Sequence, residues 1–213
     1  MKVAIFQFSL FGINTYVVYD PATKDCAVID PGMSTQRERE ALAGFIDREG
    51  LKVTHLINTH LHVDHVAGNG FVTSTYGVEP EAHAGDEPLG RQIGQQARMF
   101  GLRDEVADVT LGHRLEEGDT IRIGEGELKV IHVPGHSPGG LALYDKADGF
   151  VIAGDSLFYR SIGRTDLAGG DHRQLITALK EKLLTLPDNT VVYPGHGEPT
   201  TIGEEKRGNM FLQ

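Results

Sequence analysis

The chain has 213 residues, with 39% hydrophobic and 23% charged residues, which is ordinary for one folded domain with a substantial core. A formal net charge of -10, without any run of basic residues, argues against a nucleic-acid partner. The single cysteine, Cys26, excludes an intrachain disulfide, and no apolar segment is long enough for a signal peptide or a membrane span. We therefore expect a cytoplasmic protein with one domain over residues 1–213, no membrane partner and, in the first place, a monomeric state.

The beginning of the chain predicts an antiparallel meander followed by a helix. Alternating or continuous apolar residues indicate three strands, at 2–9, 15–19 and 27–29. Ser34 or Thr35 can then cap a helix that runs to about Arg48. Asp30 ends the third strand, and we interpret it as an ordinary turn carboxylate; a contact with a ligand histidine is the alternative.

The segment 59–65 follows the predicted strand 53–57 and contains four residues able to bind a metal, His60, His62, Asp64 and His65. His60 and His62 are two positions apart, so in an extended chain both imidazoles point to the same side. Asp64 and His65 then fall where a helix is expected to begin. The segment would thus present two pairs of ligands in two directions, although a chance surface cluster of histidines is the simpler alternative.

Three distant residues argue against that simpler alternative, because each follows an apolar run: His136 after 128–133, Asp155 after 150–153 and His196 after 191–193. Side chains at the carboxyl ends of strands converge on one rim of a sheet. We interpret the remaining histidines as packed or surface residues: His55, His83, His113, His132 and His172.

The other elements complete a fold with two similar halves. Further helices are expected from His65 to about Tyr76 and at 89–100, 172–184 (capped by Asp171) and 202–207. Two hairpins are expected, one at 120–123 with 128–133 and the other at 141–144 with 150–153, and the last strand is expected at 190–193. Residues 1–110 and 111–213 each combine strands with helices and carry ligands. This predicts an α/β (α+β) fold of two stacked sheets with helices outside, a four-layer αββα sandwich, with the site between the ends of the sheets.

Seven nitrogen and oxygen ligands are too many for one tetrahedral ion but suit two ions that share a carboxylate. Asp155 is the natural bridge. The first ion would be bound by His60, His62, His136 and Asp155, and the second by Asp64, His65, His196 and Asp155. We expect two divalent ions, with zinc as first choice and iron or manganese as alternatives. Asp64 and Asp155 are our catalytic candidates, and a hydroxide between the ions would attack a thioester, whose thiolate leaves without full protonation.

This ligand pattern resembles that of the metallo-β-lactamase-fold hydrolases, and especially the short bacterial form of the type II glyoxalases (hydroxyacylglutathione hydrolases). Segments 96–102, 161–166 and 209–213 add to the resemblance. It implies hydrolysis of a thioester such as S-D-lactoylglutathione to D-lactate and glutathione. The chain ends 17 residues after His196 (213 minus 196), so we expect no C-terminal helical glutathione-binding domain.

The resemblance also suggests substrate contacts. Arg164 lies where long-form glyoxalases place a basic residue near the thiol substrate, and Tyr159 would lie at the mouth of the site. A surface arginine is the alternative for Arg164. Three other functions stay open: a persulfide dioxygenase that uses one iron, a lactonase or esterase on the same fold, and a metal-binding module without turnover. Each predicts a different metal content or substrate.

Overall fold

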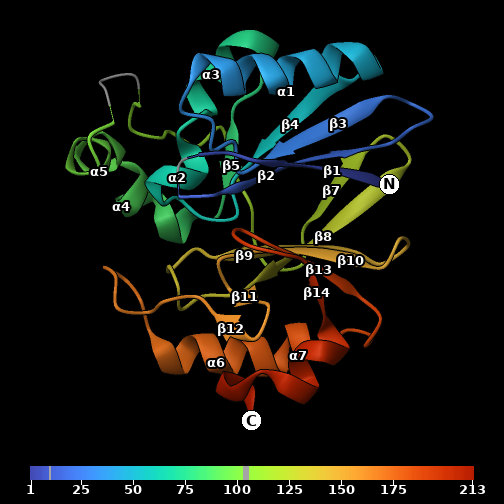
Figure 1. Ribbon diagram of the computed structural model, residues 1–213, viewed down its shortest axis with the longest axis vertical. Coiled ribbons are helices and arrows are strands. Elements are labelled where there is room, and N and C mark those ends of the chain that lie inside the picture. Colours follow the sequence, from blue (N-terminus) through green and yellow to red (C-terminus); the bar gives the residue numbers. More distant parts are fainter. Residues whose placement is uncertain (10, 103–105) are drawn as a thin grey trace.

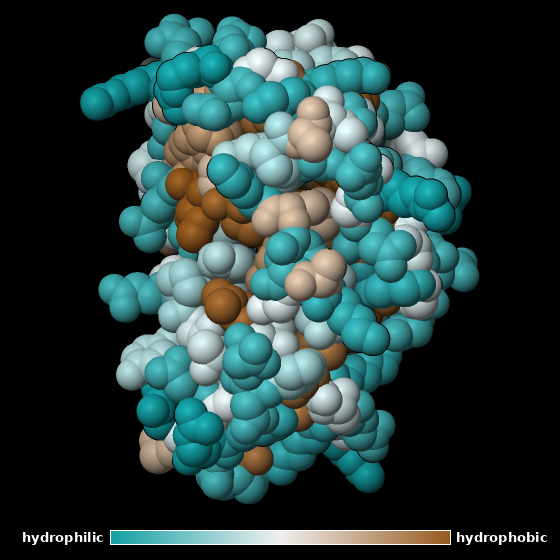
Figure 2. Space-filling view, turned by 90° about the vertical axis from the view of Figure 1, so that its right-hand side faces the viewer, coloured by the Kyte–Doolittle hydropathy of each residue, from teal (hydrophilic) through white to brown (hydrophobic). Residues whose placement is uncertain are grey.

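The computed structural model describes residues 1–9, 11–102 and 106–213. Two six-stranded sheets lie face to face, and helices cover both outer faces (Figure 1). The four-layer αββα sandwich predicted from the sequence is therefore confirmed. Figure 2 shows the face on the right of Figure 1, where hydrophilic residues predominate and hydrophobic residues gather mainly in the upper half.

The first sheet has the strand order β1-β2-β3-β4-β5-β6. Its strands are β1 (Lys2–Gln7), β2 (Asn14–Tyr19), β3 (Asp25–Ile29), β4 (Lys52–Ile57), β5 (Pro80–Ala82) and β6 (His113–Arg114). The first three are antiparallel, as the predicted meander requires, whereas β4, β5 and β6 continue parallel to β3. Parallel strands end at the same edge, so loops that follow them meet there.

Helices α1 (Gln36–Glu49) and α3 (Asn69–Tyr76) cover the outer face of this sheet (Figure 1). Leu42 and Ile46 of α1 pack in one cluster with Val28 of β3. Thr35, one of the two expected caps, begins α1 through a reciprocal capping box with Glu38. The helix ends at Gly50, which adopts the left-handed conformation that glycine allows.

Two expected helices are each divided in the structure. The helix expected from His65 to Tyr76 is interrupted after α2 (Val63–Val66), because Gly68 donates its backbone N–H to Pro31 O at 2.6 Å instead of to α2. The helix expected at 89–100 consists of α4 (Glu87–Gly90) and α5 (Ile93–Met99), preceded by the 3-10 turn η1 (Ala84–Asp86). Both segments are helical, as predicted, but neither forms one continuous helix.

The second sheet has the order β14-β13-β10-β9-β8-β7. Its strands are β7 (Thr120–Ile123), β8 (Gly126–His132), β9 (Leu141–Asp145), β10 (Phe150–Gly154), β13 (Val191–Pro194) and β14 (Thr200–Thr201). Both predicted hairpins are present, and β13 runs parallel to β10. A small ribbon of β11 (Leu157–Phe158) and β12 (Ser161–Ile162) follows β10.

Helices α6 (His172–Glu181) and α7 (Ile202–Gly208) cover the outer face of the second sheet (Figure 1). Asp171 caps α6 as predicted, and the 3-10 turn η2 (Leu183–Thr185) follows it; another, η3 (Met210–Leu212), lies near the end of the chain. No helix in the described part of the chain is long and apolar enough to cross a membrane.

The core between the two sheets contains large apolar side chains from both. Tyr16 and Ile57 of the first sheet share one buried cluster with Leu128 and Ile152 of the second. Burial of such side chains contributes about 1.5–3 kcal/mol each. The packed sheets thereby hold the loops after β4, β8, β10 and β13 against one another.

Candidate metal centre

All seven predicted metal ligands lie together where the loops after β4, β8, β10 and β13 meet. Their donor atoms form three overlapping groups, each within 4.8 Å: His60, His62 and His136; His60, His65 and Asp155; Asp64, His65 and His196. The first and third groups match the two halves of the predicted binuclear site. Asp155 lies between them, with carboxylate oxygens 3.4 Å from His65 Nε2, 3.6 Å from His136 Nε2 and 3.7 Å from His196 Nε2.

The loop after β4 supplies four of the seven residues. His60 follows the strand, His62 is the N-cap of α2, and Asp64 and His65 occupy the first turn of that helix. The short helix brings the His65 ring against the ring of His60, at 3.9 Å between centroids, so both pairs of side chains face the same centre.

Backbone carbonyls fix the orientation of two histidines. His136 Nδ1 lies 2.7 Å from Arg164 O, and His196 Nδ1 lies 3.1 Å from Phe11 O. A carbonyl oxygen only accepts hydrogen bonds, so Nδ1 donates in both rings and the lone pair stays on Nε2. Both Nε2 atoms face the other ligands, which is the orientation that metal coordination requires.

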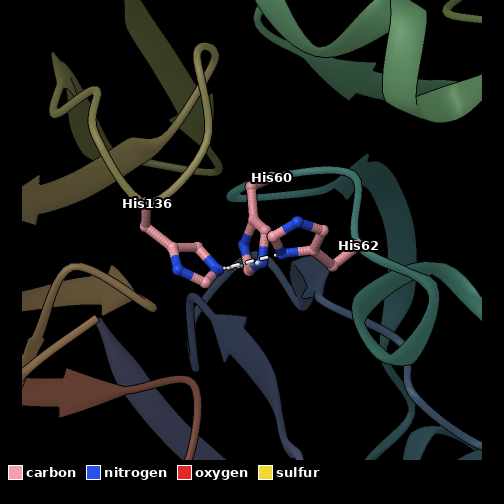
Figure 3. A group of neighbouring side chains, drawn as sticks. All are labelled: His60, His62 and His136. Atoms are coloured by element: carbon pink, nitrogen blue, oxygen red, sulfur yellow. Dashed lines mark hydrogen bonds between the residues drawn. The ribbon is translucent and has the colours of Figure 1, made fainter. Parts of the chain in front are cut away.

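Three imidazoles converge on one point (Figure 3). His136 Nε2 lies 2.9 Å from His62 Nδ1 and 3.2 Å from His60 Nε2. Because the only lone pair of His136 Nε2 faces two other ring nitrogens, a bound cation satisfies this group better than hydrogen bonds do.

Three buried atoms of the site lack a hydrogen bond in the structure: His65 Nδ1, which has only the ion-pair contact with Asp30, His65 Nε2 and Asp155 Oδ1. Unpaired buried polar atoms are rare and costly in folded proteins, and binding of an ion satisfies them. The donor set, with imidazoles, carboxylates and no thiolate, suits zinc, iron or manganese. The residues present therefore fit a binuclear metal centre.

Asp30 is completely buried, and its Oδ2 lies 3.0 Å from His65 Nδ1. The same carboxylate accepts hydrogen bonds from Thr59 N at 2.7 Å and from Thr59 Oγ1 at 2.6 Å. Our interpretation of Asp30 as an ordinary turn carboxylate was therefore wrong, and the alternative, a partner for a ligand histidine, is the arrangement observed. Its position at the end of β3, next to β4, was the sequence signal.

Burial and neighbouring charges separate the protonation states of the ligands. Burial lowers the pKa of His60 well below its usual value, and the surrounding histidines lower it further, so its ring is neutral. Burial also disfavours charge on His65, but the carboxylates of Asp30, Asp155 and Asp64 outweigh it and raise the pKa. The Asp155 carboxyl is buried as well, yet nearby His65, His196 and His136 hold its pKa far below the usual range. Asp155 is thus ionised and available as a shared ligand.

Asp86 is a buried residue that connects two ligand loops and that the sequence did not single out. Its Oδ2 accepts from Leu61 N at 3.0 Å and from Ser137 Oγ at 2.9 Å, and Oδ1 accepts from Gly139 N at 2.6 Å. An acidic residue before a short helix gives no sequence signal for such a role.

Asn14 holds the loop of His196 in a similar way. Its side-chain amide donates to Pro194 O at 3.1 Å and to Gly197 O at 2.8 Å, and its backbone N–H donates to Gly195 O at 2.7 Å. A Cβ at Gly195 would lie 2.8 Å from His65 Cε1, so only glycine fits at this point of the loop. Like Asp86, Asn14 was not singled out from the sequence.

The two predicted substrate contacts lie at a cavity of about 560 Å³ that opens on Asp155 and His196. Arg164 lines this cavity, but its side chain is 62% exposed and forms a fork with Asp166, at 2.8 and 2.7 Å. Tyr159 also lines the cavity and is 54% exposed. The structure thus places both residues beside the candidate metal centre.

A larger hollow of about 900 Å³ lies elsewhere, along β4, β5, β6 and β7, and none of the seven ligands lines it. The smaller cavity is the one that reaches the candidate centre, because Asp155 and His196 line it. His55 lines the larger hollow and contacts Glu81 and Arg122 O, at 2.6 and 3.0 Å. His83 stacks on His132 at 4.1 Å. These residues, together with exposed His113 and His172, lie outside the donor groups, as expected.

Comparison with known proteins gives a consistent family. Residues 9–196 match the model of the metallo-beta-lactamase superfamily. The chain is 35% identical to hydroxyacylglutathione hydrolase GloC of Haemophilus influenzae, over 100% of this chain and 98% of that protein. It is 32% identical to the mitochondrial persulfide dioxygenase ETHE1 of Mus musculus, over 93% of this chain and 70% of that protein.

Two solved structures are similar over the full length of both chains. The BLEG-1 B3 metallo-beta-lactamase has a TM-score of 0.88 at 33% identity and 100% coverage of each chain. TTHA1623, crystallised in a di-iron-bound form, has a TM-score of 0.85 at 36% identity, also with 100% coverage of each chain. The proteins on this scaffold thus include a lactamase and a protein that binds two irons.

Proposed function

The chain belongs to the metallo-β-lactamase superfamily, and from this premise we propose that it is a metal-dependent hydrolase of thioesters such as S-D-lactoylglutathione, which it cleaves to D-lactate and glutathione. The observation that carries the proposal is the arrangement of the seven donors, with Asp155 between two groups of ligands. The similarity to hydroxyacylglutathione hydrolase GloC supports the choice of a thioester.

Neither Cys26 nor Ser156 is placed to act as the nucleophile of a hydrolysis. Cys26 is completely buried in the core, and Ser156, next to Asp155, donates its hydroxyl to Ala153 O at 2.6 Å. Two divalent ions, when bound, supply a water-derived nucleophile at neutral pH and polarise the substrate carbonyl. We propose two ions per chain, with zinc as first choice and iron or manganese as alternatives.

In this reaction the protein orients the metal-binding side chains and provides a cavity for the substrate. Asp30 and the backbone carbonyls of Arg164 and Phe11 hold ligand rings with their free nitrogen toward the centre. Arg164 and Tyr159 lie where the rest of the substrate would extend. A thioester suits this site because a thiolate with a pKa near 8.5 leaves without a dedicated general acid. We further propose that the protein acts as a cytoplasmic monomer on a small molecule, without nucleic acid or membrane.

The test combines elemental analysis of the purified protein with release of glutathione from S-D-lactoylglutathione. About two metal ions per chain and rapid release are the expected results. Metal without turnover of any thioester would contradict the proposal and leave a metal-binding module.

The similarity to persulfide dioxygenase ETHE1 favours a second candidate, oxidation of a glutathione persulfide with one iron. It predicts about one iron per chain, oxygen uptake with glutathione persulfide and slow thioester cleavage. A lactone and a β-lactam, assayed in parallel, would identify the remaining hydrolytic activities of this scaffold.

A further inference from the structure

We propose that the cavity beside Asp155 and His196 binds an apolar acyl group, so that the preferred substrates are thioesters of acids larger and more hydrophobic than lactate. This inference rests on the proposed thioester hydrolysis. Three observations carry it: the cavity's apolar wall, the ion pair made by the one cationic side chain among the described lining residues, and an exposed aromatic pair that includes Phe11, whose backbone contacts His196.

The wall of the cavity is built by the β11–β12 ribbon. Phe158, Tyr159 and Ile162 line it, and the Phe158 ring lies 6.4 Å from the ring of His196, between centroids. A volume of about 560 Å³ is within the range of small-molecule sites and far larger than a lactoyl group needs. An apolar group that left water to fill this space would gain free energy in proportion to its buried area.

The charges along the cavity do not favour a polyanionic occupant. Arg164 is the one cationic side chain among the described lining residues, and its guanidinium is already bound by both oxygens of Asp166. Glu198 adds a negative charge. Arg160 stacks over the Tyr159 ring at 5.5 Å and does not line the cavity. Glutathione has two carboxylates, so the acyl group is the part of the substrate that this lining suits.

A second aromatic pair lies next to the same histidine. Phe11, whose carbonyl oxygen is 3.1 Å from His196 Nδ1, packs edge-on against Phe100 at 5.1 Å. Both rings are 55% exposed. Isolated exposed hydrophobic residues are common, but a contiguous group beside a functional centre is typical of ligand sites. Phe11, whose backbone contacts His196, thus carries an exposed aromatic pair with Phe100, in addition to the Phe158 ring that faces His196.

The test uses the metal-loaded full-length protein and a series of glutathione thioesters with lactoyl, acetyl, butyryl and hexanoyl groups. Thiol release gives kcat/KM while the thiol carrier stays constant. Each added methylene that enters the cavity is expected to raise kcat/KM about fourfold. Phe158→Ala is expected to reduce this increase, so that hexanoyl loses more than acetyl.

The control is Ile5→Ala, which removes another exposed apolar side chain, 45% exposed, from the distant edge strand β1. It should leave the dependence on chain length unchanged. If Phe158→Ala fails to fold or to retain metal, Ile162→Ala provides the same comparison.

The outcomes separate the two proposals. Equal kcat/KM across the series, or a preference for lactoyl, would overturn the apolar acyl site while thioester hydrolysis stands. No cleavage of any thioester would overturn both.

Discussion

Asp86 accepts a hydrogen bond from the hydroxyl of Ser137 at 2.9 Å and, through the same oxygen, another from the backbone N–H of Leu61 at 3.0 Å. Leu61 lies between His60 and His62, and Ser137 follows His136, so one carboxylate holds both loops that supply the first ligand group. Replacement of one oxygen by an NH₂ group would leave a buried donor without an acceptor.

Asp86→Asn is therefore expected to lower the free energy of unfolding by about 2 kcal/mol and to weaken metal binding about tenfold. Urea denaturation and competition with a chelator measure these two quantities. Asp188→Asn is the control, because Asp188 forms an exposed ion pair with Lys206 at 2.6 Å and its loss should cost under about 1 kcal/mol. Wild-type metal affinity in the Asp86 variant would show that this carboxylate does not organise the centre.

His62→Ala and Asp155→Ala are expected to strip metal and abolish turnover. Asp155 lies between the two donor groups, so its loss removes a ligand from both. Elemental analysis of each purified variant gives the number of ions per chain. His172→Ala, an exposed histidine of α6, should retain the full metal content. Two ions and full activity in Asp155→Ala would disprove its role as bridge.

The clustering of the candidate ligands and the layers of the fold were predictable because their signals are local. His60 and His62 follow an apolar strand at a spacing of two, and His136, Asp155 and His196 each follow another strand. Periodicity identifies such strands, and the rule that their ends converge brings the side chains together.

The supporting residues were not predictable, because their roles depend on contacts distant in the sequence. Asp86 reaches the loop of Ser137, 51 positions away, and Asn14 reaches Pro194, 180 positions away. The end of α2 was missed for a similar reason, since Gly68 bonds to Pro31 rather than within a helix. Neither a turn signal nor a propensity contains that information.

Arg164→Ala is expected to raise KM for an acidic thioester a few-fold, with a smaller loss of kcat. The effect should be modest because Asp166 already binds the guanidinium. The Arg164 carbonyl that holds His136 is unaffected by the substitution. Steady-state kinetics with S-D-lactoylglutathione measures both constants. Asp166→Asn, which frees the guanidinium, should lower KM. An unchanged KM in both variants would show that Arg164 does not contact the substrate.

Cys26→Ser is expected to leave turnover and metal content unchanged while it lowers the free energy of unfolding by about 1–2 kcal/mol. Cys26 is completely buried in the cluster with Val28 and Leu42, and burial raises the pKa of its thiol to about 12. A hydroxyl in the same place loses hydrogen bonds to water. The native thiol should resist a thiol reagent and react only on unfolding; rapid labelling of the native protein would contradict its burial.

Glu38 is expected to make stability depend on pH below about 4.5. Partial burial alone would raise the pKa of its carboxyl, but hydrogen bonds from Ser9, Ser34 and Thr35 outweigh this and lower it to about 2. A pKa lowered in the folded state means that the carboxylate stabilises the protein above its unfolded value, 4.5, and that this contribution is lost as pH falls toward 2. Because the group is partly exposed, we expect a contribution of about 1–2 kcal/mol. The free energy of unfolding is measured by urea denaturation between pH 5 and about 2. Glu38→Gln should abolish this part of its pH dependence, relative to wild type. Glu40→Gln, an exposed change on the same helix, should retain it. Parallel curves for wild type and Glu38→Gln over this range would show that the cap of α1 contributes no pH dependence.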